Sequence, residues 1–177
     1  MINMVYQNVI EIPGAFLVPG FSIYVLEVIK DNKKWFYIGM TGDPYYPSAR
    51  SAFHRLSGHL EKSKGSTQNQ LKIALHEKLG ITNDKELSKL TFRMYHYPIS
   101  GFREFTADIF DTITVSELKN TGEYEDYKRS QRLVHTLEKA LIFKLGEKRL
   151  NKTNGKQIPI DEIPFQDIYN NILELIK

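Results

Sequence analysis

The sequence predicts an α+β fold built on a small sheet, and three observations lead to this prediction. A β-branched, apolar run at 21–29 is followed by a polar turn and a second apolar run at 35–39, which is typical of a hairpin. An alternating, aromatic run at 90–99 predicts a third strand. Helical periodicity between and after these runs gives the order β-β-α-α-β-α, which by itself indicates a small mixed sheet.

The N-terminal residues 1–20 are apolar but are interrupted by two Pro-Gly pairs that mark turns, so we expect an arm or an edge strand there. The run at 21–29 is apolar on both faces, as expected of a buried strand. Residues 30–33 have the polar composition of a turn, and 35–39 form the return strand.

The turn between the first two strands decides which side chains share a face. With Asp31 and Asn32 as its two central residues, Tyr24 and Tyr37 fall on one face and Gly39 lies opposite Tyr24. We expect a residue without a side chain at this point to leave room for a substrate beside the phenol. Taken alone, tyrosines in strands are more often structural, with rings in the core and hydroxyls at its rim.

Apolar residues at helical spacing predict four helices, over about 48–62, 71–79, 127–148 and 168–176. The apolar stripe of the first is expected to hold Ala49, Phe53, Leu56 and Leu60. That of the long third helix is expected to hold Val134, Leu137, Leu141 and Leu145. Loops are predicted at 42–47, 63–67 and 152–159. The mixed, acidic stretch at 101–125 has no firm assignment.

Length and composition are those of an ordinary globular protein. At 177 residues, with 41% hydrophobic and 25% charged residues, the chain can form one domain with a substantial core. There is no apolar run of the ~20 residues that span a bilayer, and no basic segment leading into an apolar one, so we expect no membrane association. The absence of cysteine excludes disulfides and thiolate metal sites and favours a cytoplasmic protein. A net charge of +3 is compatible with nucleic-acid binding but does not require it.

Arg55 and His59 are one helical turn apart, so they project from the same face of the predicted helix. A guanidinium is a fixed cationic fork for phosphate oxygens, and a neighbouring imidazole can orient or protonate a reacting group. A solvated basic helix face is the commoner reason for such a pair. Arg50 lies close by and is a second candidate for the arginine role.

Two polar residues are notable late in the chain. Glu138 lies in or beside the apolar stripe of its helix, where a carboxylate is either an edge residue reaching water or a group held for a purpose. Mg²⁺ is a natural partner, because it often takes one or two protein carboxylates and completes its shell with water and phosphate oxygens. His135 shares the face of Glu138, which leaves a transition-metal site as an alternative. Asn151 follows in a polar loop, where turn formation or capping is its simplest role.

Taken together and in order, these fragments resemble the GIY-YIG endonuclease superfamily, whereas no P-loop, dinucleotide-binding fingerprint, HExxH or GxSxG motif is present. The matching fragments are Ser22-Ile23-Tyr24, Tyr37-Ile38-Gly39-Met40-Thr41, Arg55-Leu56, His59-Leu60, Glu138 and Leu150-Asn151. The resemblance covers about Phe21 to Asn154. Serine stands where the first motif of the family opens with glycine. The gap between Gly39 and Arg55 is longer than in minimal members, which keeps Arg50 as a competing candidate.

The resemblance implies a compact sandwich with a three-stranded antiparallel sheet flanked by helices and a shallow cleft. It also implies metal-dependent hydrolysis of a DNA phosphodiester, with Mg²⁺ or Mn²⁺ as cofactor. By position, Tyr24 would be the general base or would orient the attacking water, with Tyr37 as its hydrogen-bonded companion. Arg55 would stabilise the charged transition state, and His59 would assist proton transfer or position the leaving-group side.

In the same resemblance Glu138 would bind the metal, and Asn151 would hold the site together without touching the substrate. We expect an arm or an edge strand at 1–20, a nuclease core at 21–155 and a C-terminal helical extension at 156–177. An insertion at about 101–128 precedes the last core helix. DNA is the implied partner, and the chain could act as a monomer or a homodimer.

Several functions fit this set of residues. A lone core with an insertion suits a restriction-type or mobile-element enzyme, and a structure-specific DNA repair nuclease is the next alternative. A catalytically silent nucleic-acid-binding module would be expected to lack a tyrosine, the arginine or the glutamate. An interaction protein unrelated to nucleic acid would leave the ordered set of residues unexplained.

Overall fold

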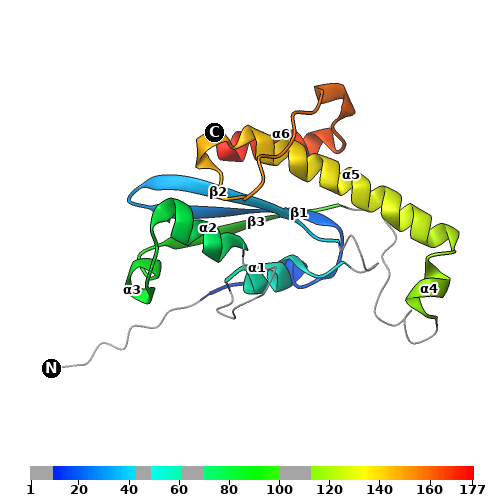
Figure 1. The fold of residues 1–177 in the computed structure, drawn as a ribbon, viewed down its shortest axis with the longest axis horizontal. Helices are drawn as coiled ribbons and strands as arrows, with labels where there is room; N and C mark the ends of the chain where they lie inside the picture. The colour runs from blue at the N-terminus through cyan, green and yellow to red at the C-terminus, as the bar shows by residue number, and fades with distance from the viewer. Residues whose placement is uncertain (1–9, 43–48, 61–69, 100–112) are drawn as a thin grey trace.

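A three-stranded antiparallel sheet forms the centre of the computed structural model (Figure 1), which describes residues 10–42, 49–60, 70–99 and 113–177. The strands are β1 (Ser22–Lys30), β2 (Lys33–Met40) and β3 (Thr91–Pro98), in the spatial order β2-β1-β3. The α+β class and the antiparallel sheet are confirmed. The mixed sheet expected from element order alone is wrong, because a hairpin reverses β2 and the following helices return β3 antiparallel to the other side of β1.

The β1–β2 hairpin has the register predicted from its turn. Asp31 and Asn32 adopt φ angles of 49° and 61°, a left-handed conformation that short polar side chains tolerate, and they close a two-residue turn. Tyr24 therefore pairs with Gly39, and Tyr24 and Tyr37 belong to the same core on one face of the sheet. Both predictions are confirmed.

The helices of the described residues are α1 (Ala52–Leu60), α2 (Gln70–Leu79), α3 (Asp84–Leu87), α4 (Val115–Leu118), α5 (Gly122–Lys144) and α6 (Gln166–Ile176). Short 3-10 turns lie at Gly14–Phe16, Gly146–Lys148 and Ile160–Glu162. Helix α2 ends where predicted. Helix α5 begins at Gly122 rather than at Tyr127, because the Thr121 side chain caps it by accepting a hydrogen bond from the Tyr124 N–H.

Two helical layers cover the two faces of the sheet (Figure 1). Helices α1 and α2 pack on the face that carries Tyr24 and Tyr37, and α5 and α6 pack on the face that carries Ile23 and Val25. The predicted stripe of α5 is buried in this second core, through Val134, Leu137, Leu141 and Leu145. Between the two cores, β1 is buried along most of its length.

Helix α1 does not bury the apolar stripe expected of it. Leu56 packs only partly against the core and Leu60 is exposed. The buried residues of α1 are Ala52, Gly58 and His59. A polar imidazole can lie against the sheet here because the Tyr24 hydroxyl offers it a hydrogen-bonding partner.

The described part of the N-terminal segment, residues 10–20, contains a 3-10 turn and no strand. Other predictions fall outside the described residues: the first nine residues of the predicted arm or edge strand, the loop at 43–47, the helix break at 63–67 and the insertion over 101–112. Among the described helices, none combines the length and the apolar character of a bilayer-spanning segment.

Candidate active site

Tyr24 and His59, which are buried, form a cluster with the partly buried Arg55 between β1 and α1. The Tyr24 hydroxyl oxygen lies 2.7 Å from Nε2 of His59, and the Arg55 guanidinium donates a hydrogen bond to the same oxygen. Because a guanidinium can only donate, the Tyr24 oxygen accepts from Arg55 and its hydrogen is available to Nε2 of His59. The one-turn spacing of Arg55 and His59 thus brings both side chains to one phenol.

Tyr37 joins this cluster from the neighbouring strand, β2. Its ring meets the imidazole of His59 edge-on, with a centroid distance of 4.7 Å and an interplanar angle of 62°. The ring of Tyr24 lies 5.9 Å from the same imidazole. His59 is therefore buried between phenols from two adjacent strands.

The space beside Gly39 is not available to a substrate. A Cβ atom at Gly39 would lie 2.2 Å from the Tyr24 hydroxyl oxygen and 2.3 Å from its Cζ atom. The Tyr24 ring itself lies over Gly39 and has no exposed surface. The expectation of a substrate gap at this point is wrong, because the missing side chain makes room for the phenol that reaches His59 and Arg55.

Burial dominates the ionisation of both phenols. It raises the pKa of Tyr24 to about 12, although the charge and the hydrogen bond of Arg55 act in the opposite direction. Burial, together with Tyr24 and Glu138, raises the pKa of Tyr37 well above its ordinary value. Both side chains are therefore neutral phenols near pH 7, able to donate hydrogen bonds.

Arg55, rather than Arg50, interacts with the tyrosines. Arg50 is exposed and donates a hydrogen bond of 3.2 Å to Nε2 of His54 on the outer surface. Burial lowers the pKa of Arg55, but Tyr24, Tyr37 and Glu138 raise it overall, so the guanidinium stays charged. Its buried Nε–H has no acceptor among the described residues. A buried donor left unpaired costs about 1–3 kcal/mol, which an anionic ligand would relieve.

Asn151 reaches the site at the free edge of β2. This strand has β1 on one side only, so its outward-facing backbone groups need other partners. The Asn151 side chain accepts a hydrogen bond from the Ile38 N–H at 3.0 Å and donates one to the Ile38 carbonyl at 2.6 Å. Next to it, the Leu150 N–H donates to the carbonyl of Phe36 at 2.7 Å. Asn151 thus completes the edge of the sheet instead of making a turn or capping a helix.

Glu138 comes from α5, on the opposite face of the sheet from Tyr24, but its carboxylate reaches the same edge. There it accepts a hydrogen bond from the Met40 backbone and interacts electrostatically with Arg55 and both tyrosines. Burial raises the pKa of Glu138 to about 7, outweighing Arg55, Met40 and Lys139, while 18% of its side chain stays exposed. Its negative charge is therefore only partly compensated by the protein.

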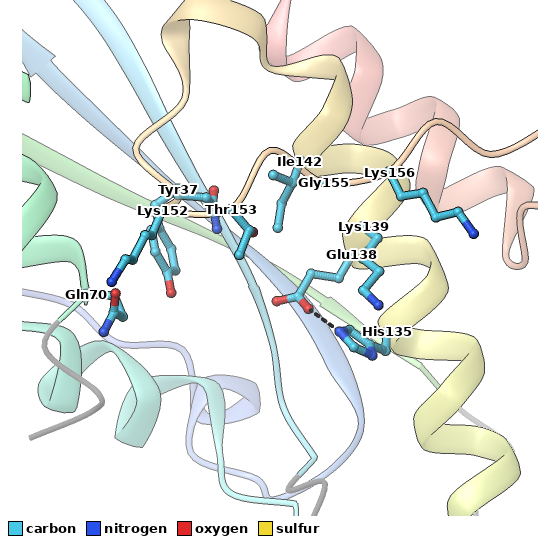
Figure 2. A pocket seen from close by; sticks show the side chains of 11 residues that line it. Tyr37, Gln70, His135, Glu138, Lys139, Ile142, Lys152, Thr153, Gly155 and Lys156 are labelled. Carbon is cyan, nitrogen blue, oxygen red and sulfur yellow. Dashed lines mark ion pairs between the residues drawn. The ribbon is translucent and has the colours of Figure 1, made fainter.

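Tyr37, Glu138 and Asn151 line one cavity of about 600 Å³ (Figure 2). Helix α5 forms one wall and the loop at 151–156 forms the other. The remaining lining residues are Gln70, His135, Lys139, Ile142, Lys152, Thr153, Gly155 and Lys156. The structure thus brings all six predicted site residues together, with three of them facing the cavity and the cluster of Tyr24, Arg55 and His59 beside Tyr37.

Glu138 is the carboxylate in this cavity that could hold a cation. Within the described ranges, no group of three His, Asp or Glu side chains could bind one metal ion. Magnesium does not need such a group, and the partly uncompensated charge of Glu138 fits a largely hydrated Mg²⁺ or Mn²⁺. His135 Nε2 lies 3.9 Å from Glu138 Oε2, and the pKa of His135 is lowered by burial and by the charge of Lys139. His135 and Glu138 together would be only two protein ligands, which are few for a transition metal.

The loop wall of the cavity is held from both sides. Gly155 has a φ of 70°, and a Cβ atom there would lie 2.5 Å from the backbone oxygen of Lys139 in α5. The Lys156 N–H donates to that same oxygen at 3.0 Å. On the other side, Lys78 of α2 donates a hydrogen bond of 3.2 Å to the carbonyl of Asn151. The loop therefore has a defined position relative to Glu138.

The loop wall and its support were not expected at the site from the sequence. In the sequence, the lysines of this wall and its support look like ordinary solvated charges; they are Lys78, Lys139, Lys152 and Lys156. The segment Asn151-Lys152-Thr153-Asn154-Gly155-Lys156 combines turn residues with lysines directly after a long helix, which is a signal for a binding loop. Ser22, which departs from the glycine of the family motif, donates its N–H to Thr41 Oγ1 at 2.7 Å and so joins the ends of β1 and β2.

Comparisons with protein-family models, with curated proteins and with solved structures find no match for this chain.

Proposed function

We propose that this protein is a metal-dependent DNA endonuclease of the GIY-YIG type, which hydrolyses a phosphodiester bond. The observation that supports it is the meeting of Tyr37, Arg55 and Glu138, from three different elements, at one edge of the sheet. Tyr37 and Glu138 offer a phenol donor and a carboxylate to one cavity, and Arg55, which interacts electrostatically with both, is a permanent cation. Phosphodiester hydrolysis needs charge neutralisation and an aligned water more than covalent help, which suits this set.

In this proposal Arg55 stabilises the charge that develops on the phosphoryl group. Its Nε–H is an unused donor, and its position is set by the hydrogen bond to Tyr24. A donor held in place before the reaction needs no reorganisation at the transition state, and this is where such groups contribute most.

The two tyrosines have different tasks. A phenol with a pKa of about 12 is a poor general base near neutral pH, so Tyr24 serves as the positioning residue that holds Arg55 and His59. Tyr37 lines the cavity and orients the water or a phosphate oxygen by donating a hydrogen bond. His59 accepts the hydrogen bond of the Tyr24 hydroxyl at Nε2 and so fixes the orientation of that phenol.

Glu138 is the residue proposed to hold Mg²⁺ or Mn²⁺ against the phosphate, and Asn151 maintains the β2 edge beside it. When bound, the ion would supply positive charge next to the phosphate oxygens. A restriction-type or mobile-element enzyme fits a single core with an insertion, and we expect it to act on DNA in the cytoplasm.

Incubation with supercoiled plasmid DNA and Mg²⁺ tests the proposal. Wild-type protein should nick or linearise the plasmid. Arg55→Ala should cut at least about 10²-fold more slowly, with an unchanged circular dichroism spectrum. Arg50→Ala is the matched control, because it removes an exposed arginine near the same helix, and it should cut at the wild-type rate. No cleavage of plasmid, linear or branched DNA with either metal would refute the proposal, and a dead Arg50→Ala beside an active Arg55→Ala would reassign the arginine.

A second variant in the same experiment separates binding from cleavage. Glu138→Gln keeps the shape of the side chain but removes its charge, so it should bind DNA at least as well as wild type and fail to cut. Calorimetry should show weak Mg²⁺ binding by the free protein, because a single carboxylate holds a mostly hydrated ion until a phosphate joins its shell. Tight Mg²⁺ binding without DNA, retained in Glu138→Gln, would mean that the metal is held elsewhere.

A further inference from the structure

Three lysines line the cavity, one at one end and two at the other. Figure 2 shows Lys152 at the end formed by Tyr37 and Gln70, and Lys139 and Lys156 at the other end, with Glu138 between them. They come from both walls, since Lys139 is on α5 and the other two are on the loop at 151–156. Positive charge is therefore present on both sides of the carboxylate.

The backbones of these lysines are fixed while their side chains remain exposed. The Lys156 N–H is bonded to the Lys139 carbonyl, and Gly155 allows the loop to approach α5 closely. Lys78 holds the carbonyl of Asn151, the residue before Lys152. Among the described residues, the ion pairs involve other side chains and do not neutralise these three ammonium groups.

We infer that Lys152 on one side of Glu138, and Lys139 and Lys156 on the other, form a track that holds the phosphate backbone of the DNA strand on both sides of the bond to be cut. The inference rests on the proposed function and adds to it the path of the substrate. A lone phosphate bound at Glu138 would need positive charge at one point, whereas a continuous strand presents phosphates in both directions. Lysine ammonium groups bind phosphate as point charges, so this track positions the strand without reading its sequence.

The salt dependence of DNA binding tests the track without requiring cleavage. Fluorescence anisotropy with a labelled duplex, in EDTA and over a series of salt concentrations, compares wild type with the double variant Lys152→Gln/Lys156→Gln. Each lost phosphate contact lowers the slope of log K against log salt by about 0.9. The double variant should therefore bind about 10-fold more weakly at physiological salt, with a slope reduced by about 2, and equally so for unrelated sequences.

The control is Lys85→Gln/Lys89→Gln, which removes the same charge from exposed lysines in and after α3, outside the cavity. It should bind as wild type does. Each single variant, Lys152→Gln and Lys156→Gln, should lower the slope by about 1, because the two lysines act at different ends. If one single variant accounts for the whole effect, the strand does not pass Glu138 on both sides and the inference is wrong.

Failure of the track and failure of the proposed function give different results. If wild type cuts DNA but the double variant binds it like the control, the track is wrong and the endonuclease stands. If wild type never cuts DNA but the double variant loses DNA binding as described, the track stands and the endonuclease does not. Competition by inorganic phosphate at concentrations far below those of the salt series would indicate a small-anion site and would overturn the track.

Discussion

The phenol ring of Tyr24 occupies the place where a side chain at position 39 would otherwise lie. Its hydroxyl is bonded to both polar side chains that α1 directs at the sheet, Arg55 and His59. Because the ring is fully buried and bonded at its end, it has little freedom to move aside. The arrangement of the cluster therefore depends on the absence of a single methyl group at Gly39.

Gly39→Ala tests this dependence. The new Cβ would lie 2.2 Å from the Tyr24 oxygen, so the ring must leave His59, and we expect a loss of about 1–3 kcal/mol in the free energy of unfolding. Urea unfolding of Gly39→Ala, Tyr24→Ala and the double variant measures the coupling. In the Tyr24→Ala background the same substitution should have little effect, and an equal loss in both backgrounds would contradict the clash.

The edge of β2 is completed by the segment that follows α5. Arg149 forms an isolated parallel bridge with Phe36, Leu150 donates to the carbonyl of Phe36, and Asn151 bonds both backbone groups of Ile38. This segment takes the place of a fourth strand, and it protects an edge that could otherwise pair with another chain. It also sets the cavity loop in register with β2, because that loop starts at Asn151.

Asn151→Ala should therefore destabilise the protein by about 2–4 kcal/mol, since both buried polar groups of Ile38 lose their partner. Asn151→Asp should destabilise the protein by at least as much as Asn151→Ala, because a carboxylate oxygen would face the Ile38 carbonyl where the amide now donates. Asn171→Ala, at an exposed position in α6, is the control and should change stability by less than about 0.5 kcal/mol. Chemical unfolding measures all three, and wild-type stability in Asn151→Asp would show that the amide donor is not required.

At the scale of the whole molecule, one buried carboxylate on β1 links all three strands of the central sheet. Glu27 of β1 is fully buried, with Oε1 2.8 Å from Lys34 Nζ on β2 and Oε2 3.2 Å from Arg93 Nη1 on β3. Tyr95, also on β3, donates a hydrogen bond to the same carboxylate. Burial raises the pKa of Glu27, but the bonds from Lys34, Tyr95 and Arg93 lower it overall, below 4.5.

This lowered pKa predicts a pH dependence of stability. A group that ionises more readily in the folded state stabilises it above the ordinary glutamate pKa of 4.5, and the contribution is lost as the pH falls below that value. At neutral pH the free energy of unfolding of wild type should exceed that of Glu27→Gln by about 1–3 kcal/mol. This difference in stability should shrink as the pH falls. Denaturation at several pH values measures it, with the exposed Glu147→Gln expected to follow wild type. A difference that stays constant down to about pH 3 would exclude the charge as the cause.

Much of the fold and part of the site could be predicted because they depend on neighbours in the chain. The period of apolar residues predicts the strands and the α5 stripe, and Asp31-Asn32 predicts the hairpin register that places both tyrosines on one face. The helical repeat brings Arg55 and His59 to one side of α1. Each of these follows from backbone geometry over a few residues.

The sequence by itself thus determined the α+β class, the hairpin and the shared faces of the residue pairs. Only the tertiary structure decided that Tyr24 fills the gap at Gly39, that Glu138 reaches around the sheet edge and that lysines lie on both sides of it. Asn151 and Ile38 are 113 residues apart in the chain, and no local pattern links them. Such contacts are chosen by the packing of two helical layers on one sheet, where an exposed strand edge must find its hydrogen-bonding partners.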